Sequence, residues 1–122
     1  DGNQRAIFLG DATALTAGDD QLTKQGERVL ERVGALFNKF PDKQIWVIGH
    51  TDDNPIVRAG WVSNWELSTA RAISVVRYLA SRGVSPRHLV AAGFGEFQPL
   101  EAGNTEEILR RNRRIELKLT ER

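Results

Sequence analysis

Two long stretches of the chain repeat apolar residues at three- and four-residue steps. The first begins near Leu22, and its apolar members are Val29, Leu30, Val33, Leu36, Phe37 and Phe40. Charged and amide side chains fill most of the positions between them, which is typical of an α-helix with one buried side. Thr23 can cap the start of this helix and Pro41 ends it. The pattern therefore predicts an amphipathic helix packed on a core.

The second helical stretch starts near Ser63 or Asn64 and runs to about Arg82. The glycine and proline that follow are typical of the residues after a helix end. We expect its core-facing residues to be Trp65, Thr69, Ala72, Ile73, Val76, Leu79 and Ala80. On a helical wheel Arg71 falls outside this apolar face, which places its side chain away from the core.

Four shorter stretches have the composition of β-strands. They cover residues 4–9, 44–49, 89–95 and 114–120. The last one alternates apolar and polar residues strictly, as a strand does when one face lies on a core. Residues 99–112 are expected to form a loop with at most one helical turn. The order strand, helix, strand, helix, strand, strand predicts an α/β (α+β) two-layer sandwich, with a mixed four-stranded sheet and two main helices on one face.

The composition fits a single domain over residues 1–122, because 40% of the residues are apolar and 27% are charged. A net charge of +1 argues against nucleic acid as a partner, since phosphate binding needs a basic excess. No stretch approaches the roughly 20 apolar residues that span a bilayer. Membrane attachment is thus expected only through segments outside this chain. Asp1-Gly2 is not a natural start, so we expect a processed or excised part of a longer protein.

The polar residues that follow the second strand are candidates for catalysis or metal binding. His50, Asp52 and Asp53 lie together, but a catalytic zinc site typically uses three protein ligands and His88 lies in a separate turn. The chain has no cysteine to supply a thiolate ligand or nucleophile. The serines lie at helix starts and in loops, contexts that already explain them, and none is paired with an evident base. We predict no catalytic residue, no metal and no cofactor.

Asp52 and Arg71 are the strongest candidates for ligand binding. Asp52 stands at the exit of a strand and Arg71 in the second turn of the next helix. The start of a helix disfavours a cation and attracts an anion, so an arginine there needs a carboxylate partner. That partner is either Asp52, in an ordinary salt bridge, or a ligand. A ligand with both an ammonium and a carboxylate would fit between the two side chains.

Several motifs then occur in an order that is specific to one family. They are Gly49-His50-Thr51-Asp52, Asn64-Trp65-Glu66-Leu67-Ser68-Thr69-Ala70-Arg71-Ala72, Gly93-Phe94-Gly95-Glu96 and Asn112-Arg113-Arg114-Ile115-Glu116. Over essentially its whole length the chain resembles the OmpA-like peptidoglycan-binding domain of outer-membrane proteins, peptidoglycan-associated lipoproteins and flagellar stator proteins. The segment from Ser63 to Arg71 and the long loop after Asp52 resemble the MotB-type branch in particular.

The resemblance implies an OmpA-C-like fold and a non-catalytic site for the meso-diaminopimelate residue of the peptidoglycan peptide stem. Asp52 would bind the ammonium of its free amino-acid end and Arg71 the carboxylate. The other residues implied at the site are Thr51, Asn64, Leu67, Asn112 and Arg114. The implied location is the periplasm of a Gram-negative cell, where the domain would anchor a protein of the inner or outer membrane to the wall.

One segment departs from the family pattern. Glu107-Ile108-Leu109 stands where the family commonly has Glu-Gly-Arg, and Arg110 or Arg111 could replace the missing arginine. A second hypothesis uses this departure: a protein-interaction or homodimerisation module of a stator-like or envelope complex, with an apolar contact through the altered segment and weak or no wall binding. A third and least favoured hypothesis is a metal-dependent hydrolase at His50 and Asp52.

Overall fold

Four strands of the computed structural model form one mixed sheet in the order β1-β4-β2-β3. The structure describes residues 5–10, 22–54 and 62–121, and only the backbone of β1 and of residue 121. The strands are β1 (Arg5–Gly10), β2 (Lys43–His50), β3 (Leu89–Gly93) and β4 (Arg114–Glu121). Strand β4 runs antiparallel to both β1 and β2, whereas β2 and β3 are parallel and are connected through a helix.

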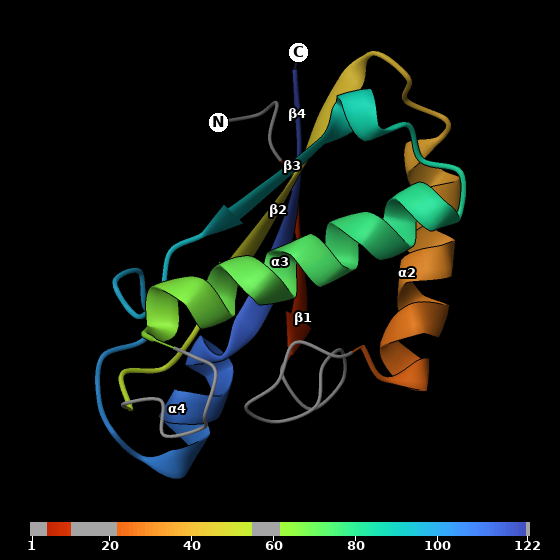
Figure 1. Cartoon of the computed structure of the whole chain (residues 1–122). Coiled ribbons are helices and arrows are strands. Elements are labelled where there is room, and N and C mark those ends of the chain that lie inside the picture. The colour runs from red at the N-terminus through yellow and green to blue at the C-terminus, as the bar shows by residue number, and fades with distance from the viewer. Residues whose placement is uncertain (1–4, 11–21, 55–61, 122) are drawn as a thin grey trace.

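Two long helices, α2 (Lys24–Phe37) and α3 (Asn64–Ser81), pack on the same core. Figure 1 shows α3 crossing in front of the sheet, with α2 beside it. Val47 of β2 and Leu117 of β4 are register partners in the buried layer beneath the helices, and neither is exposed to solvent. The prediction of an α+β fold in which helices pack on a mixed sheet is confirmed.

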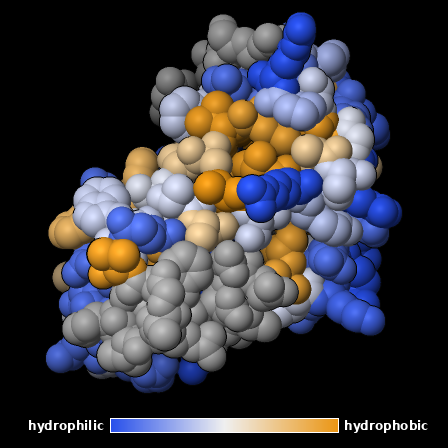
Figure 2. All heavy atoms as spheres, viewed as in Figure 1, coloured by the Kyte–Doolittle hydropathy of each residue, from blue (hydrophilic) through white to orange (hydrophobic). Residues whose placement is uncertain are grey.

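Hydroxyl side chains cap both helices where the sequence predicts their starts. The Thr23 hydroxyl accepts a hydrogen bond of 2.9 Å from the Gly26 N–H, and the Ser63 hydroxyl accepts one of 3.1 Å from the Trp65 N–H. Helix α2 ends at Phe37, three residues earlier than its apolar repeat suggests, and Phe40 is 41% exposed. Hydrophilic side chains cover the outer side of α2, while apolar ones gather beside α3 (Figure 2).

The predicted core face of α3 is confirmed at Ala72 and Leu79, which are fully buried, and is wrong at Trp65 and Ile73. Trp65 is 49% exposed and Ile73 36%, whereas Arg71 is only 2% exposed. The buried row consists of Asn64, Leu67, Ser68, Arg71, Ala72, Val75 and Leu79. The reason is a close approach of α3 to the sheet: a Cβ atom added to Gly49 would lie 2.1 Å from the Ser68 carbonyl oxygen. Small residues at this close approach therefore help to fix which side of the helix faces the strands, and Leu67, Val75 and Leu79 lie on the same buried side.

The loop predicted over residues 99–112 contains a further helix, α4 (Glu106–Asn112). A short 3₁₀ helix, η1 (Pro86–His88), precedes β3. The Thr105 hydroxyl caps α4 by accepting a hydrogen bond of 3.2 Å from the Ile108 N–H. Leu109 is 7% exposed, so it anchors the helix in the fold. Among the described residues, no helix combines the length and the apolar character needed to cross a membrane.

Candidate functional site

The end of the sheet at which β2 finishes collects the residues that the sequence singles out. The segment after β2, the first turn of α3, the loop after β3 and α4 all lie at this end (Figure 1). Two hydrogen bonds of 2.9 Å connect these segments: the Thr51 N–H donates to the Gly95 carbonyl, and the Gly95 N–H donates to the Ser68 hydroxyl. The loops at this end therefore rest on the sheet and on α3.

Asp52 is a nearly buried carboxylate, 8% exposed, with protein partners on both oxygens. Its Oδ1 accepts a hydrogen bond of 3.1 Å from the Asn54 N–H, and its Oδ2 forms an ion pair of 2.6 Å with the Arg113 Nη1. The other terminal nitrogen of Arg113 lies 3.3 Å from the Glu106 Oε1. These contacts fix the orientation of the Asp52 carboxylate. Arg113 is a site residue that sequence reasoning missed, since the motif Asn112-Arg113-Arg114 drew attention to its two neighbours.

Asn64 and Asn112 hold the backbone around Asp52. The amide nitrogen of Asn64 lies 3.1 Å from the Asn54 carbonyl and 3.3 Å from the Glu96 Oε1. The side chain of Asn112 accepts hydrogen bonds from the backbone N–H groups of residues 100 and 101 and donates one to the carbonyl of residue 101. Both amides are at least nine-tenths buried. Their predicted place beside Asp52 agrees with the structure, and what they bond there is largely backbone.

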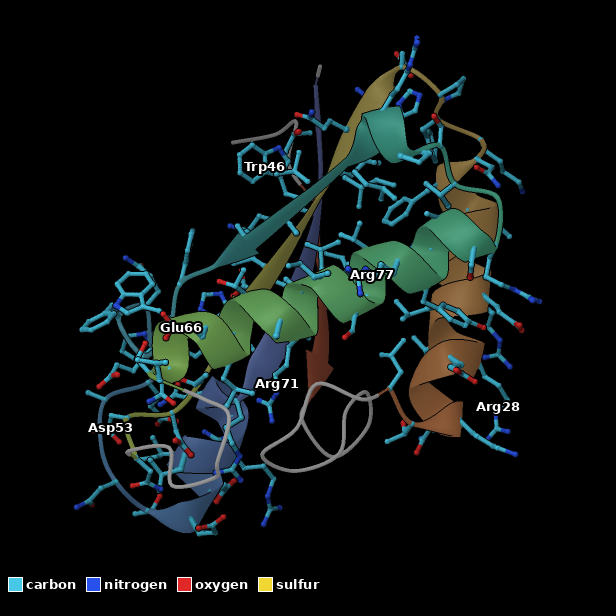
Figure 3. The ribbon with its side chains drawn as sticks, in the orientation of Figure 1. Arg28, Trp46, Asp53, Glu66, Arg71 and Arg77 are labelled. Atoms are coloured by element: carbon cyan, nitrogen blue, oxygen red, sulfur yellow. The ribbon has the colours of Figure 1, made fainter. Side chains whose placement is uncertain are left out.

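A pocket of about 240 Å³ lies beside Asp52 and Asn112. Its walls are Thr51, Asp52, Asp53, Glu96, Pro99, Glu101, Ala102, Gly103 and Asn112. Figure 3 shows Asp53 on the loop after β2, at the same end of the molecule as the start of α3. Four of the nine wall residues carry a carboxylate and none carries a cationic side chain. Asp52 and Glu101 are paired with arginines outside the wall, which leaves Asp53 and Glu96 to give the pocket a net negative charge that favours a ligand with a positively charged group.

The other predicted site residues do not form part of this wall. Leu67 is 3% exposed and belongs to the buried row of α3. Arg71 is 2% exposed and leaves α3 on the side toward α4 (Figure 3). Arg114 lies 2.7–2.8 Å from the Glu116 Oε2 through two of its nitrogens and donates to the Gln98 carbonyl at 3.0 Å. Arg71 and Arg114 are thus buried charges near the pocket and not residues of its lining.

His50 lies outside the pocket wall, 2% exposed in the sheet and next to Glu116. Its Nε2 is 3.5 Å from the Glu116 Oε2, and the Phe94 ring meets it edge to face with centroids 5.4 Å apart. Burial, and after it the nearby Arg114 charge, lower the pKa of His50 from 6.5 to about 4, against the opposing effect of Glu116. His50 is therefore neutral at pH 7. Among the described residues, no group of three or more His, Cys, Asp or Glu side chains could hold a metal ion.

The segment that departs from the family pattern supports the pocket wall at Gly103 without lining the pocket itself. Ile108 packs over Gly103, since a Cβ atom on that glycine would lie 2.7 Å from the Ile108 Cδ1. Arg111 forms ion pairs with Glu107 and, at 2.6 Å, with Glu101 of the pocket wall. Leu109 is buried within the domain, so an apolar contact of the Ile108-Leu109 segment with a partner would have to come from the partly buried Ile108.

Comparison with known proteins gives consistent matches. Residues 16–113 match the model of the OmpA family. In sequence the chain is 33% identical over 116 residues to the peptidoglycan-binding protein ArfA of Mycobacterium tuberculosis and 29% identical over 112 residues to Motility protein B of Bacillus subtilis. These alignments cover 93% and 91% of this chain but only 34% and 43% of the relatives, so the chain spans less than half of their length.

Two solved structures are similar over almost the entire chain. The crystal structure of a MotB-like protein from Desulfovibrio vulgaris has a TM-score of 0.93 and 32% identity, and the match covers 100% of this chain and 78% of that one. The periplasmic domain of Helicobacter pylori MotB has a TM-score of 0.91 and 26% identity, with 98% and 77% covered.

Proposed function

The chain belongs to the OmpA family and has MotB homologues, and from this premise we propose that it binds cell-wall peptidoglycan without catalysis and anchors a larger protein or complex to the wall. The relative ArfA, which is named as a peptidoglycan-binding protein, supports the choice of ligand. The periplasmic origin of the H. pylori MotB domain supports a location in the periplasm. Attachment to the inner or outer membrane would come from parts of the protein outside this chain.

The proposed contact is the meso-diaminopimelate residue of the peptide stem, and the single observation that carries it is the carboxylate-rich pocket at Asp52. An ammonium group is the cationic end of that amino acid. Each oxygen of a carboxylate can accept two hydrogen bonds, so Asp52 retains acceptor capacity beside the Asn54 N–H and Arg113. A charge-assisted hydrogen bond to the ammonium would contribute roughly 1.5–3 kcal/mol.

The carboxylate of the same ligand needs a cation, and we assign it to Arg71 on the family resemblance. With 2% of its surface exposed, Arg71 can reach a ligand only through a small opening, and its full positive charge would act there in a poorly hydrated setting. Thr51, Asn64, Leu67, Asn112 and Arg114 act in this proposal mainly by holding the surrounding backbone and packing. Arg113 joins them because it orients Asp52.

Co-sedimentation of the purified domain with diaminopimelate-type sacculi tests this proposal. We expect Asp52→Asn and Arg71→Lys each to weaken binding by roughly 10- to 100-fold, as expected for one charge-assisted hydrogen bond. Arg77→Lys is a matched control for Arg71, because Arg77 lies on the same helix but is exposed (Figure 3). Asp42→Asn, in the exposed turn before β2, is the control for Asp52.

Thermal unfolding of every variant separates loss of binding from loss of fold. If Asp52→Asn and Arg71→Lys remain folded and sediment as well as the two controls, the site assignment is wrong. If the unaltered domain does not sediment with sacculi at all, the proposed function is wrong as well.

A further inference from the structure

Two aromatic side chains form an exposed stack beside the pocket. Trp65, in the first turn of α3, is 49% exposed, and Phe97, in the loop after β3, is 56% exposed. Their ring centroids lie 4.9 Å apart with an angle of 29° between the planes. The two rings come from segments more than 30 positions apart in the chain, and neither belongs to the hydrophobic core. Packing of the core therefore does not explain this Trp65–Phe97 stack.

The stack is held on rigid backbone. Gly95 has a φ of +63°, and a Cβ atom placed there would lie 3.5 Å from both rings, so the turn passes directly beneath the stack. The hydrogen bond from the Gly95 N–H to Ser68 fixes this turn on α3. The Phe97 N–H donates to the Phe94 carbonyl at 3.3 Å and closes the turn. An aromatic surface that is ordered before a ligand arrives loses little conformational entropy on binding.

The stack is continuous with the pocket. Asn64 and Glu96 are the chain neighbours of Trp65 and Phe97, and the Asn64 amide bonds the Glu96 carboxylate at 3.3 Å. Glu96 is itself part of the pocket wall. A ligand seated against Asp52 would therefore extend over the aromatic rings if it left the pocket past Glu96.

We propose that the Trp65–Phe97 stack is a subsite for a sugar ring of the glycan strand to which the bound peptide stem is attached. The inference rests on the proposed peptidoglycan site. The C–H bonds on one face of a pyranose ring are slightly positive and apolar, and they pack on the negative face of an aromatic ring. Glu66 follows Trp65 at the start of α3 (Figure 3) and Glu96 precedes Phe97, and their carboxylates can accept hydrogen bonds from sugar hydroxyls.

A sugar fits this surface better than a protein or a lipid does. Two rings make a small apolar area, whereas a stable protein interface buries roughly 1,200–2,000 Å². The flanking carboxylates also repel an anionic membrane surface. A neutral ring with hydroxyl donors matches both the size and the charge of the stack.

The experiment compares two soluble ligands by calorimetry: the diaminopimelate-containing stem peptide alone, and the same peptide attached to its disaccharide. We expect the unaltered domain to bind the disaccharide form more tightly. In Trp65→Ala and Phe97→Ala, affinity for the disaccharide form should fall about three- to tenfold, the loss expected for one aromatic contact, while affinity for the bare peptide stays unchanged.

Two further variants serve as controls. Phe97→Tyr keeps the ring and should still bind the disaccharide form more tightly than the bare peptide. Phe40→Ala removes an exposed aromatic ring before the start of β2, far from the pocket, and serves as the control.

The outcomes separate the subsite from the main site. Equal affinity of the unaltered domain for both ligands, or equal weakening of both ligands by Trp65→Ala, would overturn the sugar subsite and leave the diaminopimelate site standing. Self-association that Trp65→Ala abolishes, seen by analytical ultracentrifugation, would assign the stack to a second copy and also overturn it. If Asp52→Asn leaves both affinities unchanged while Trp65→Ala removes only the gain from the disaccharide, the main site fails and the sugar subsite is supported.

Discussion

The ion pair between Arg113 and Asp52 makes a prediction about stability. The Asp52 side chain is 9% exposed and that of Arg113 is 22% exposed, so the pair is shielded more than an ordinary surface salt bridge. Arg113→Ala leaves the carboxylate without its cation and should lower the free energy of unfolding by about 1–3 kcal/mol. Urea denaturation measures this change.

Arg110→Ala is the matched control for Arg113→Ala. Arg110 lies on α4, is exposed, and should change the free energy of unfolding by no more than about 0.5 kcal/mol. Equal effects of the two substitutions would show that the contact with Asp52 adds nothing to stability.

The burial of His50 should make the free energy of unfolding depend on pH. Its pKa is about 4 in the folded protein and 6.5 in the reference state, so the unfolded chain binds the proton more readily. The stabilisation from the neutral ring is complete above pH 6.5 and is lost as the pH falls toward 4. Between pH 7 and pH 5 the free energy of unfolding should drop by about 2 kcal/mol on account of this residue.

Urea denaturation of the unaltered domain and of His50→Gln at both pH values measures this contribution. The glutamine variant cannot take up the proton, so its loss of stability over this range should be smaller by about the same 2 kcal/mol. Identical pH dependence in the two proteins would mean that the neighbourhood of Glu116, Arg114 and Lys118 accommodates the protonated ring.

Sequence analysis identified most residues of the candidate site but missed Arg113. Asp52, Asn64 and Asn112 lie in motifs that sequence analysis recognised; the Asn64 amide donates to the Asp52 carbonyl, and Asp52 and Asn112 line the same pocket. Arg113 was missed because it lies in a run of four arginines between positions 110 and 114, and nothing in the sequence tells which one reaches Asp52. The backbone at Arg113, with φ −80° and ψ 92°, leaves the helical conformation there and so separates the direction of its side chain from those of α4.

The contact of α3 with the sheet depends on glycines in the strands. A Cβ atom on Gly49 would come within 2.1 Å of the Ser68 carbonyl oxygen, and one on Gly93 within 2.1 Å of the Thr69 hydroxyl. Gly49→Ala must push α3 away from β2, so we expect a loss of about 1–3 kcal/mol in the free energy of unfolding. Because α3 carries Asn64 and Arg71, binding to sacculi should weaken along with stability.

Gly34→Ala is the matched control for Gly49→Ala. A Cβ atom on Gly34 of α2 meets its nearest neighbours at 3.5 and 3.6 Å, which is ordinary contact. Alanine is a better helix former than glycine, so this variant should gain up to about 1 kcal/mol. Thermal unfolding of both variants checks the opposite signs, and a stable Gly49→Ala domain with full binding would contradict the role of the close contact.

The helices and strands were predictable to different degrees for physical reasons. Long periodic segments predicted both long helices, α3 nearly to the residue and α2 with an end three residues too late, because an amphipathic repeat and a capping hydroxyl mark them locally. The burial of Ala72 and Leu79 on α3 was predicted, but the exposure of Trp65 and the burial of Arg71 were not, since they depend on glycines in strands far away in the chain. Helix α4 was missed because it has only seven residues, of which only Ile108 and Leu109 are apolar.

The pocket and Arg5, the first residue of β1, lie at opposite ends of the sheet. Arg5 lies opposite Leu119 and Lys43 opposite Glu121, whereas His50, just before the pocket residues, pairs with Arg114. Seven residue steps along β2 correspond to about 23 Å. A tether that entered the domain through β1 would therefore leave the pocket free to meet the wall on the other side.

This separation leads to a prediction about two linked copies of the domain. The proposed site offers one or two charge-assisted contacts, so each copy should bind modestly, whereas sacculi present many stems on one polymer. Joining two domains by a flexible linker makes the second binding event intramolecular and should raise the apparent affinity for sacculi roughly 100-fold or more. Affinity for a free stem peptide should not change, because such a ligand engages one site at a time.

The test compares the tandem protein, the single domain and a tandem in which one copy carries Asp52→Asn. Co-sedimentation with sacculi and calorimetry with free stem peptide measure the two affinities. The substituted tandem should return to the level of the single domain on sacculi and bind half as much peptide per molecule. If the substituted tandem binds sacculi as tightly as the unaltered tandem, binding to the wall does not depend on Asp52.

If the unaltered tandem binds sacculi no better than one domain, its linker does not span neighbouring stems, and a tandem with a longer linker is tested next. If that tandem also shows no gain in affinity for sacculi, the wall does not offer these sites in clusters.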